Sequence, residues 1–211
     1  MFYDRIIHYF LLMVRYGLPM SDDLNAPRND QRIIEHKGKS LGLVQVYTGT
    51  GKGKTTAALG LGFRAVGKGF KVFMVQFMKG DIEYGEITAA RKLEGFTIEQ
   101  FGRPDFVDKD NPEAIDIEFA KKALERVKEI FIENKFDVVI LDEVNVAIEW
   151  HLIALEDVKE LIKNKPKNTE LILTGRYAHP EIIELADLVT DMQEVKHPFK
   201  NGILARDGIE H

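Results

Sequence analysis

The chain has 211 residues, of which 45% are hydrophobic and 30% charged, and it contains no cysteine. This composition is typical of a soluble globular protein with a sizeable core, and it excludes disulfide frameworks, thiolate metal sites and cysteine nucleophiles. The net charge of −5 argues against a general nucleic-acid binder, whose basic face usually makes the total positive. We therefore expect a cytoplasmic protein that binds neither nucleic acid nor a membrane.

The first forty residues differ in character from the rest. An apolar run, Ile6 to Val14, is too short to span a bilayer, and no small-residue cleavage site follows it, which weakens the alternative of a signal peptide. We interpret Met1 to Pro19 as an extension upstream of a natural start at Met20. The polar stretch from Ser21 to Ser40 carries both charge signs, which predicts a flexible arm with a short helix around Gln31 to His36.

From residue 41 to residue 211, apolar runs alternate with amphipathic segments, as expected for one domain. Strands are predicted over Leu43–Tyr47, Lys71–Phe77, Phe96–Phe101, Val138–Leu141, Glu170–Thr174 and Leu188–Val195. Helices are predicted over Thr55–Val66, Glu83–Leu93, Pro112–Asn134, Leu155–Lys163 and Pro180–Ala186. Several of the strands are nearly continuous apolar runs, which is typical of strands covered on both faces. The alternation predicts an α/β fold with a doubly wound, mostly parallel sheet.

Ligands of such sheets bind at the carboxyl ends of the strands. Four predicted strands are followed there by glycine or polar residues. These are the glycine loop from Gly49, then Gln76, Lys79 and Gly80, then Asp142, Glu143 and Asn145, and finally Gly175 and Arg176. Their convergence on one edge predicts a binding site more strongly than any one motif.

The segment Gly49-Thr50-Gly51-Lys52-Gly53-Lys54-Thr55-Thr56 connects the first predicted strand to the first predicted helix. Glycines let backbone N–H groups converge on an anion, and the helix N-terminus adds partial positive charge. Lys54 supplies an ammonium, and the Thr55 hydroxyl can reach Mg²⁺. The standard loop has a glycine where this chain has Thr48. A plain glycine-rich turn is the alternative, but it would leave two lysines without an anion.

Two acids, Asp142 and Glu143, end the fourth apolar strand. Acids at this position hold Mg²⁺ directly or through water in nucleotide-binding α/β proteins, and spacing does not rank the two. A solvated acidic turn is the alternative. Arg176 can grip a phosphate, or it can be a surface arginine paired with Asp187 or Glu184. Arg64, on the first helix, is a further candidate for an anion contact.

These motifs together resemble one family, the P-loop type of ATP:corrinoid adenosyltransferases, from about Gly42 to the C-terminus. The resemblance is carried by the loop, by Arg64-Ala65-Val66-Gly67-Lys68-Gly69, Gln76-Phe77-Met78-Lys79-Gly80, Ile140-Leu141-Asp142-Glu143 with Asn145, Leu173-Thr174-Gly175-Arg176, and a tail that contains Ala186–Met192, Val195–Phe199 and Gly208-Ile209-Glu210. The tail is the most distinctive part, because phosphate loops alone are common.

The resemblance implies a P-loop, RecA-like fold and a transfer of the 5′-deoxyadenosyl group of ATP to the Co(I) of a corrinoid, with release of triphosphate, in adenosylcobalamin biosynthesis or salvage. It implies ATP bound in reverse in the loop, a homodimer, and a reduced flavoprotein as electron donor. The ATP-binding residues would be Gly49, Thr50, Gly51, Lys52, Gly53, Lys54, Thr55, Thr56, Arg64 and Arg176. Lys54 and Arg176 would stabilise the leaving group, and Mg²⁺ would be held by Thr55 and Glu143 with Asp142. No catalytic nucleophile or base is implied, because the cobalt of the substrate attacks.

One departure concerns the corrinoid. The family often carries a Phe-Thr-Trp element after the third strand, whereas this chain has Phe101-Gly102-Arg103-Pro104-Asp105-Phe106 and no Trp there. Two other functions compete with the transferase. A P-loop NTPase or kinase would cleave the γ-phosphate and release ADP, and a nucleotide-binding regulator or corrinoid carrier would bind ATP without turnover.

Overall fold

A computed structural model describes residues 41–80 and 83–210 of the chain. The predicted N-terminal extension, the arm and its short helix lie outside the described residues. Within the described part, no helix is long and apolar enough to cross a membrane.

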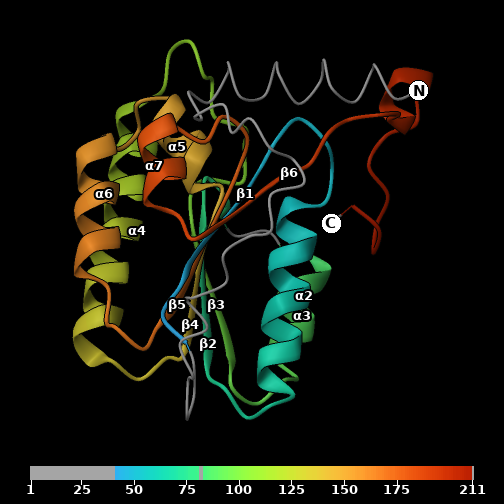
Figure 1. The fold of residues 1–211 in the computed structure, drawn as a ribbon. Coiled ribbons are helices and arrows are strands. Elements are labelled where there is room, and N and C mark those ends of the chain that lie inside the picture. Colours follow the sequence, from blue (N-terminus) through green and yellow to red (C-terminus); the bar gives the residue numbers. More distant parts are fainter. Residues whose placement is uncertain (1–40, 81–82, 211) are drawn as a thin grey trace, which may run out of the picture. The chain divides into compact units, whose positions relative to one another are not determined.

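The centre of the fold is a six-stranded sheet in the order β3-β2-β4-β5-β1-β6, in which every adjacent pair is parallel (Figure 1). The strands are β1 (Val44–Thr48), β2 (Val72–Phe77), β3 (Phe96–Phe101), β4 (Val138–Asp142), β5 (Glu170–Thr174) and β6 (Leu188–Asp191). The doubly wound parallel α/β prediction is confirmed. The first strand of the chain lies between the last two, so β1 pairs only with segments made more than 120 residues later.

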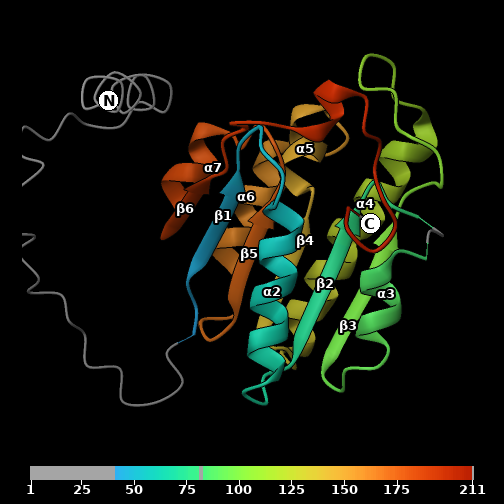
Figure 2. The same ribbon diagram turned by 90° about the vertical axis from the view of Figure 1, so that its right-hand side faces the viewer.

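Helices cover both faces of the sheet (Figure 2). They are α2 (Lys54–Val66), α3 (Gly85–Ala90), α4 (Ala114–Glu133), α5 (Val144–Glu149), α6 (Leu155–Asn164) and α7 (Pro180–Leu185), followed by a 3₁₀ turn over Pro198–Asn201. Helices α2 and α3 pack on the face that contains Met74 and Ile140, whereas α4 to α7 pack on the face that contains Phe73 and Val75. Alternate residues of β2 thus enter two different cores, which explains its continuous apolar sequence.

Helix α4 follows from its sequence most directly. Glu113 and Asp116 form a reciprocal capping box at its N-terminus, and Asn134 ends it in a left-handed conformation. Between them, residues buried at intervals of three and four face the sheet, namely Ala120, Ala123, Leu124, Val127 and Ile130.

The sequence-based prediction missed one helix and extended one strand too far. Helix α5 was not predicted, because five of its six residues, Val144 to Ile148, are buried and leave no amphipathic period to detect. Strand β6 ends at Asp191 rather than Val195, because the chain there leaves the sheet edge to run along the glycine loop.

Candidate active site

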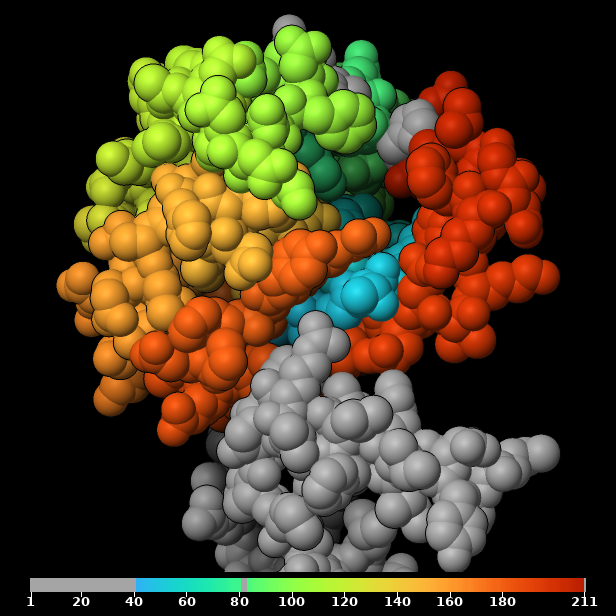
Figure 3. Space-filling model, turned by 90° about the horizontal axis from the view of Figure 1, so that it is seen from above, coloured from blue at the N-terminus to red at the C-terminus, as the bar shows by residue number. Residues whose placement is uncertain are grey.

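The carboxyl ends of β1, β2, β4 and β5 border a cavity of about 620 Å³. Figure 3 looks down on this edge, where the loop after β1 lies in a hollow between the segments that follow β3, β5 and β6. Basic and glycine residues of the loop line the cavity together with the apolar side chains of Phe77, Met78, Phe106, Val107 and Trp150. One cavity therefore combines a basic region, suited to an anion, with an apolar surface.

The loop is bent around its own lysine. Lys54 Nζ donates to the carbonyl oxygens of Gly49 (3.0 Å) and Gly51 (2.6 Å), and the lysine is 7% exposed. Burial lowers the pKa of Lys54, although the nearby Glu143 opposes this shift. Helix α2 begins at Lys54, so its N-terminal N–H groups open toward the cavity that Gly53, Lys54 and Thr55 line.

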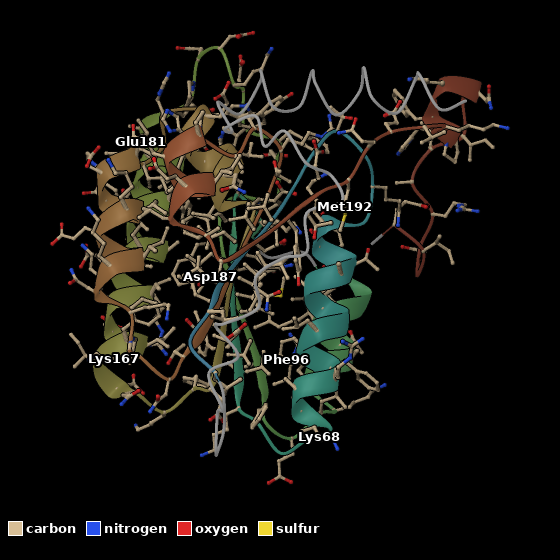
Figure 4. The ribbon with its side chains drawn as sticks, in the orientation of Figure 1. Lys68, Phe96, Lys167, Glu181, Asp187 and Met192 are labelled. Carbon is tan, nitrogen blue, oxygen red and sulfur yellow. The ribbon has the colours of Figure 1, made fainter. Side chains whose placement is uncertain are left out.

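The segment after β6 runs directly against this loop. Met192 N donates to Thr48 O (2.8 Å), and Gly51 N donates to Met192 O (2.7 Å). Figure 4 places Met192 at the N-terminal end of α2. A Cβ atom on Gly49 would lie 2.2 Å from Asp191 Oδ1 and 2.4 Å from Met192 O. The lack of a side chain at Gly49 is therefore required for the packing of Asp191 and Met192 against the loop, as well as for any contact with an anion.

The end of the tail also reaches the loop. Lys52 Nζ donates to Ile209 O (3.3 Å), and Glu210 lines the cavity. His197 lines it too, but its Nδ1 accepts from Phe199 N and so begins the 3₁₀ turn. The loop and the tail, which the sequence linked only through the family resemblance, form one wall.

Asp142 is the centre of a buried polar cluster. Its Oδ1 accepts from the hydroxyls of Thr55 (2.8 Å) and Thr174 (2.7 Å). Its Oδ2 accepts from Lys79 Nζ (2.8 Å) and Gln76 Nε2 (3.3 Å). The carboxylate is fully buried, and both oxygens are already occupied by protein donors. Although burial opposes it, Asp142 raises the pKa of Lys79 above its ordinary value.

Glu143 faces the cavity from a left-handed turn (φ 63°). Its backbone N–H donates to Thr174 Oγ1 (3.0 Å), and among the described residues no donor lies within hydrogen-bonding distance of its carboxylate. Burial, followed by the charge of Asp142, raises the pKa of this carboxyl. Glu143 is thus available to a cation, whereas Asp142 is held behind Thr55.

The two predicted arginines differ in position. Arg176 lines the cavity and has no ion pair within the described part of the chain, since Asp187 instead accepts from Val44 N (2.8 Å). Arg64 is exposed on α2, about 15 Å along the helix from Lys54, and does not line the cavity. Thr50 does not line it either, and its hydroxyl accepts from Glu194 N (3.4 Å).

Residues 40–211 match the family model described as ATP:corrinoid adenosyltransferase BtuR/CobO/CobP. The chain belongs to this family. A corrinoid adenosyltransferase of Sinorhizobium sp is 38% identical over 182 residues, which cover 85% of each chain. One of Escherichia coli strain K12 is 38% identical over 184 residues, covering 86% of this chain and 91% of the relative. Corrinoid adenosyltransferase CobA of Salmonella typhimurium is 34% identical over 185 residues, covering 87% and 92%.

The family assignment makes this protein an ATP:corrinoid adenosyltransferase, and it supports adenosyl transfer over cleavage of the γ-phosphate. ATP and a corrinoid are its substrates. The cavity of this adenosyltransferase is also lined by two cationic residues to which the sequence assigned no role, Lys79 and Arg103. Arg103 forms a bidentate pair with buried Asp116 (Nε to Oδ1 2.9 Å) and thereby fixes the connection after β3 to helix α4.

The same connection contains the stretch where the sequence departs from the family's Phe-Thr-Trp element. Phe101 is partly buried and packs against the core. Phe106 lines the cavity, and its side chain is fully exposed. Val107 beside it also lines the cavity.

Proposed function

We propose that the loop from Gly49 to Thr56 holds the triphosphate of ATP so that the ribose C5′ faces a Co(I) corrinoid bound at the apolar part of the cavity. The observation that carries the proposal is the single cavity in which Lys54, Arg176 and the start of α2 adjoin Phe106 and Trp150. A volume of about 620 Å³ lies in the usual range of small-molecule sites.

The reaction needs no protein nucleophile or base. The electron pair of Co(I) forms the new bond to C5′ while the C5′–O bond breaks, and triphosphate leaves with the two electrons of the C5′–O bond. No proton moves in this step. The negative charge that develops on the leaving oxygen is stabilised by Lys52, Lys54, Arg176 and the N–H groups at the start of α2. The enzyme otherwise aligns two reactants and excludes water.

The donor set near the loop fits a magnesium ion. Thr55 donates its only hydroxyl proton to Asp142, which leaves its oxygen lone pairs available, and the Glu143 carboxylate faces the same cavity. No group of three His, Asp or Glu side chains suited to a metal occurs in residues 41–80 and 83–210, so phosphate and water oxygens must complete the shell. Bound there, Mg²⁺ would neutralise phosphate charge.

Three further expectations rest on the family resemblance rather than on the described geometry. They are a homodimer, a reduced flavoprotein that supplies the electrons for Co(I), and a cytoplasmic location, which the absence of cysteine also favours.

The test is a product analysis. The protein is incubated with ATP, Mg²⁺ and chemically reduced cobalamin under anaerobic conditions, and the phosphorus products are identified by ³¹P NMR. We expect triphosphate and a light-sensitive alkylcobalamin in equal amounts, and neither when the corrinoid is omitted. ADP with inorganic phosphate would favour a γ-phosphate-cleaving enzyme, and bound ATP without any product would favour a carrier.

A further inference from the structure

Lys79 lies in the cavity wall, and the reaction described above does not use it. Its ammonium is 2.8 Å from Asp142 Oδ2, and its side chain is 21% exposed. It comes from the connection between β2 and α3, whereas Asp142 ends β4. Strands β2 and β4 are neighbours, and Gln76 pairs with Asp142 in their register, so the lysine is carried directly to the carboxylate.

The backbone around Lys79 is held in an unusual shape. Met78 has φ 57°, a conformation that costs a non-glycine residue on the order of 1 kcal/mol and is found mainly where the surroundings fix it. The connection between β3 and α4 packs closely against this backbone, because a Cβ atom on Gly80 would lie 1.8 Å from Gly102 O. The direction of the Lys79 side chain is therefore determined by the fold rather than by chance at the surface.

The positive charge of Lys79 compensates the buried negative charge of Asp142. Asp142 is a buried carboxylate, and its other three donors, Thr55, Thr174 and Gln76, are neutral. A buried charge is tolerated when an opposite charge and hydrogen bonds compensate it. Within the described part of the chain, Lys79 is the only cation in ion-pair contact with Asp142.

Polar side chains on β2, β3 and α3 also contact the pair formed by Lys79 and Asp142 or its neighbours. Gln100 Nε2 donates to Gln76 Oε1 (3.0 Å), while Gln76 Nε2 is shared between Asp142 Oδ2 and Glu86 Oε1, each at 3.3 Å. Gln76 is completely buried. The cluster thus crosses three adjacent strand ends and fixes the side of the carboxylate that faces away from the loop.

Asp142 in turn orients two groups at the nucleotide subsite. The Thr55 hydroxyl points its proton at Oδ1, so its lone pairs are directed elsewhere. Thr174 donates to the same oxygen and accepts from the backbone N–H of Glu143, which connects the carboxylate to the turn that carries Glu143. A shift of Asp142 would therefore disturb both residues that fit a magnesium ion.

We propose that Lys79 is a positioning residue for the Mg²⁺–ATP complex, which acts by fixing Asp142 and, through it, Thr55 and Glu143. The inference deepens the proposed function and rests on it. A different role is conceivable for a cavity lysine, namely direct contact with a phosphate, and the two roles differ in one measurable respect. Only the positioning role requires Asp142.

The experiment is a double-mutant cycle on ATP binding, measured by titration calorimetry without corrinoid so that no turnover occurs. The variants are K79M, D142N and K79M/D142N, together with K79R, which keeps the charge. K128M is the matched control, because Lys128 is an exposed lysine on α4 whose ion pair among residues 41–80 and 83–210 is with Glu125. Each protein is titrated with ATP in Mg²⁺ and again in EDTA, and each is checked by circular dichroism and thermal melting.

We expect K79M to weaken Mg²⁺–ATP binding by about tenfold or more, because it leaves a buried carboxylate without its counter-ion. We expect a smaller loss in EDTA, partial recovery in K79R, and no change in K128M. In the D142N background, K79M should change the affinity by no more than about twofold, the usual error of additivity.

Wild-type affinity in K79M would overturn the proposal, and so would an undiminished K79M effect in the D142N background, which would mean direct phosphate contact. If K79M does not fold, K79Q, which keeps a hydrogen-bond donor without the charge, takes its place. A failure of the proposed function is distinguishable, because the wild-type protein would then form no adenosylcobalamin, whatever the outcome of the cycle.

Discussion

A methyl group added to Gly49 should damage the site through two separate physical effects. Gly49 has φ 102°, a backbone conformation that side-chain-bearing residues rarely adopt. The added Cβ of Gly49→Ala would also lie 2.2 Å from Asp191 Oδ1 and 2.4 Å from Met192 O, so the tail must move away from the loop. Since the second obstacle is backbone, a rotamer change does not relieve it.

The magnitude follows from these two terms. The strained conformation costs about 1–3 kcal/mol, and overpacking against a fixed neighbour costs about 1–3 kcal/mol more. For a chain of this size, each kcal/mol lowers Tm by about 2–4 °C, so a mid-range loss of about 4 kcal/mol corresponds to about 8–16 °C. ATP binding should weaken as well, because the hydrogen bond from Gly51 N to Met192 O holds the shape of the loop.

Gly60→Ala is the matched control, because it makes the same glycine-to-alanine change in the helix that directly follows the loop. Gly60 lies within α2, and nothing is within 4 Å of a Cβ added there. Alanine in a helix is favoured over glycine by about 1 kcal/mol, so this variant should melt about 2–4 °C higher with unchanged ATP affinity. Calorimetric melting and ATP titration of both variants measure the effects. If Gly49→Ala melted with the wild type and bound ATP normally, the described packing of tail on loop would be refuted.

Three further outcomes are expected. Lys54→Ala should weaken ATP binding roughly a hundredfold and abolish transfer, because the polyphosphate loses its nearest cation; unchanged turnover would remove Lys54 from the site. Arg103→Gln should raise the KM for the corrinoid by about three- to tenfold and leave the KM for ATP nearly constant. The reason is that the ion pair between Arg103 and Asp116 fixes the connection that carries Phe106. An equal rise in both KM values would contradict that role. Deletion of Met1 to Pro19 should preserve activity, and a large loss in the transfer assay would show that the extension is a working part.

Much of the fold could be predicted because each strand carries its own signal. Continuous apolar runs such as Val138–Leu141 are typical of strands covered on both faces, and glycine loops and acids mark their carboxyl ends. Helix α5 lacked any such signal, since only the turn residue Glu143 separates it from β4 and the helix is buried on nearly all sides. The sequence also could not place β6 beside β1, because edge pairing depends on contacts between distant segments.

For the site, the sequence named residues but not their relations. It selected Lys54, Thr55, Glu143 and Arg176, and the structure brings all four to one cavity. It could not rank Asp142 against Glu143, because the difference lies in four donors from separate parts of the chain. One of them, Lys79, is 63 residues from Asp142, and only the pairing of β2 with β4 makes them neighbours.

The position of β1 between β5 and β6 has a consequence for how the protein is made. As the ribosome releases the chain, β2, β3 and β4 can assemble early, whereas β1 has no partner until residues 170–191 emerge. Such long-range pairing is slow, because the entropy of closing a large loop must be overcome first. The nucleotide-binding loop that follows β1 is therefore among the last parts of this sheet to reach its final position, and it can hold ATP only after β5 and β6 have been synthesised.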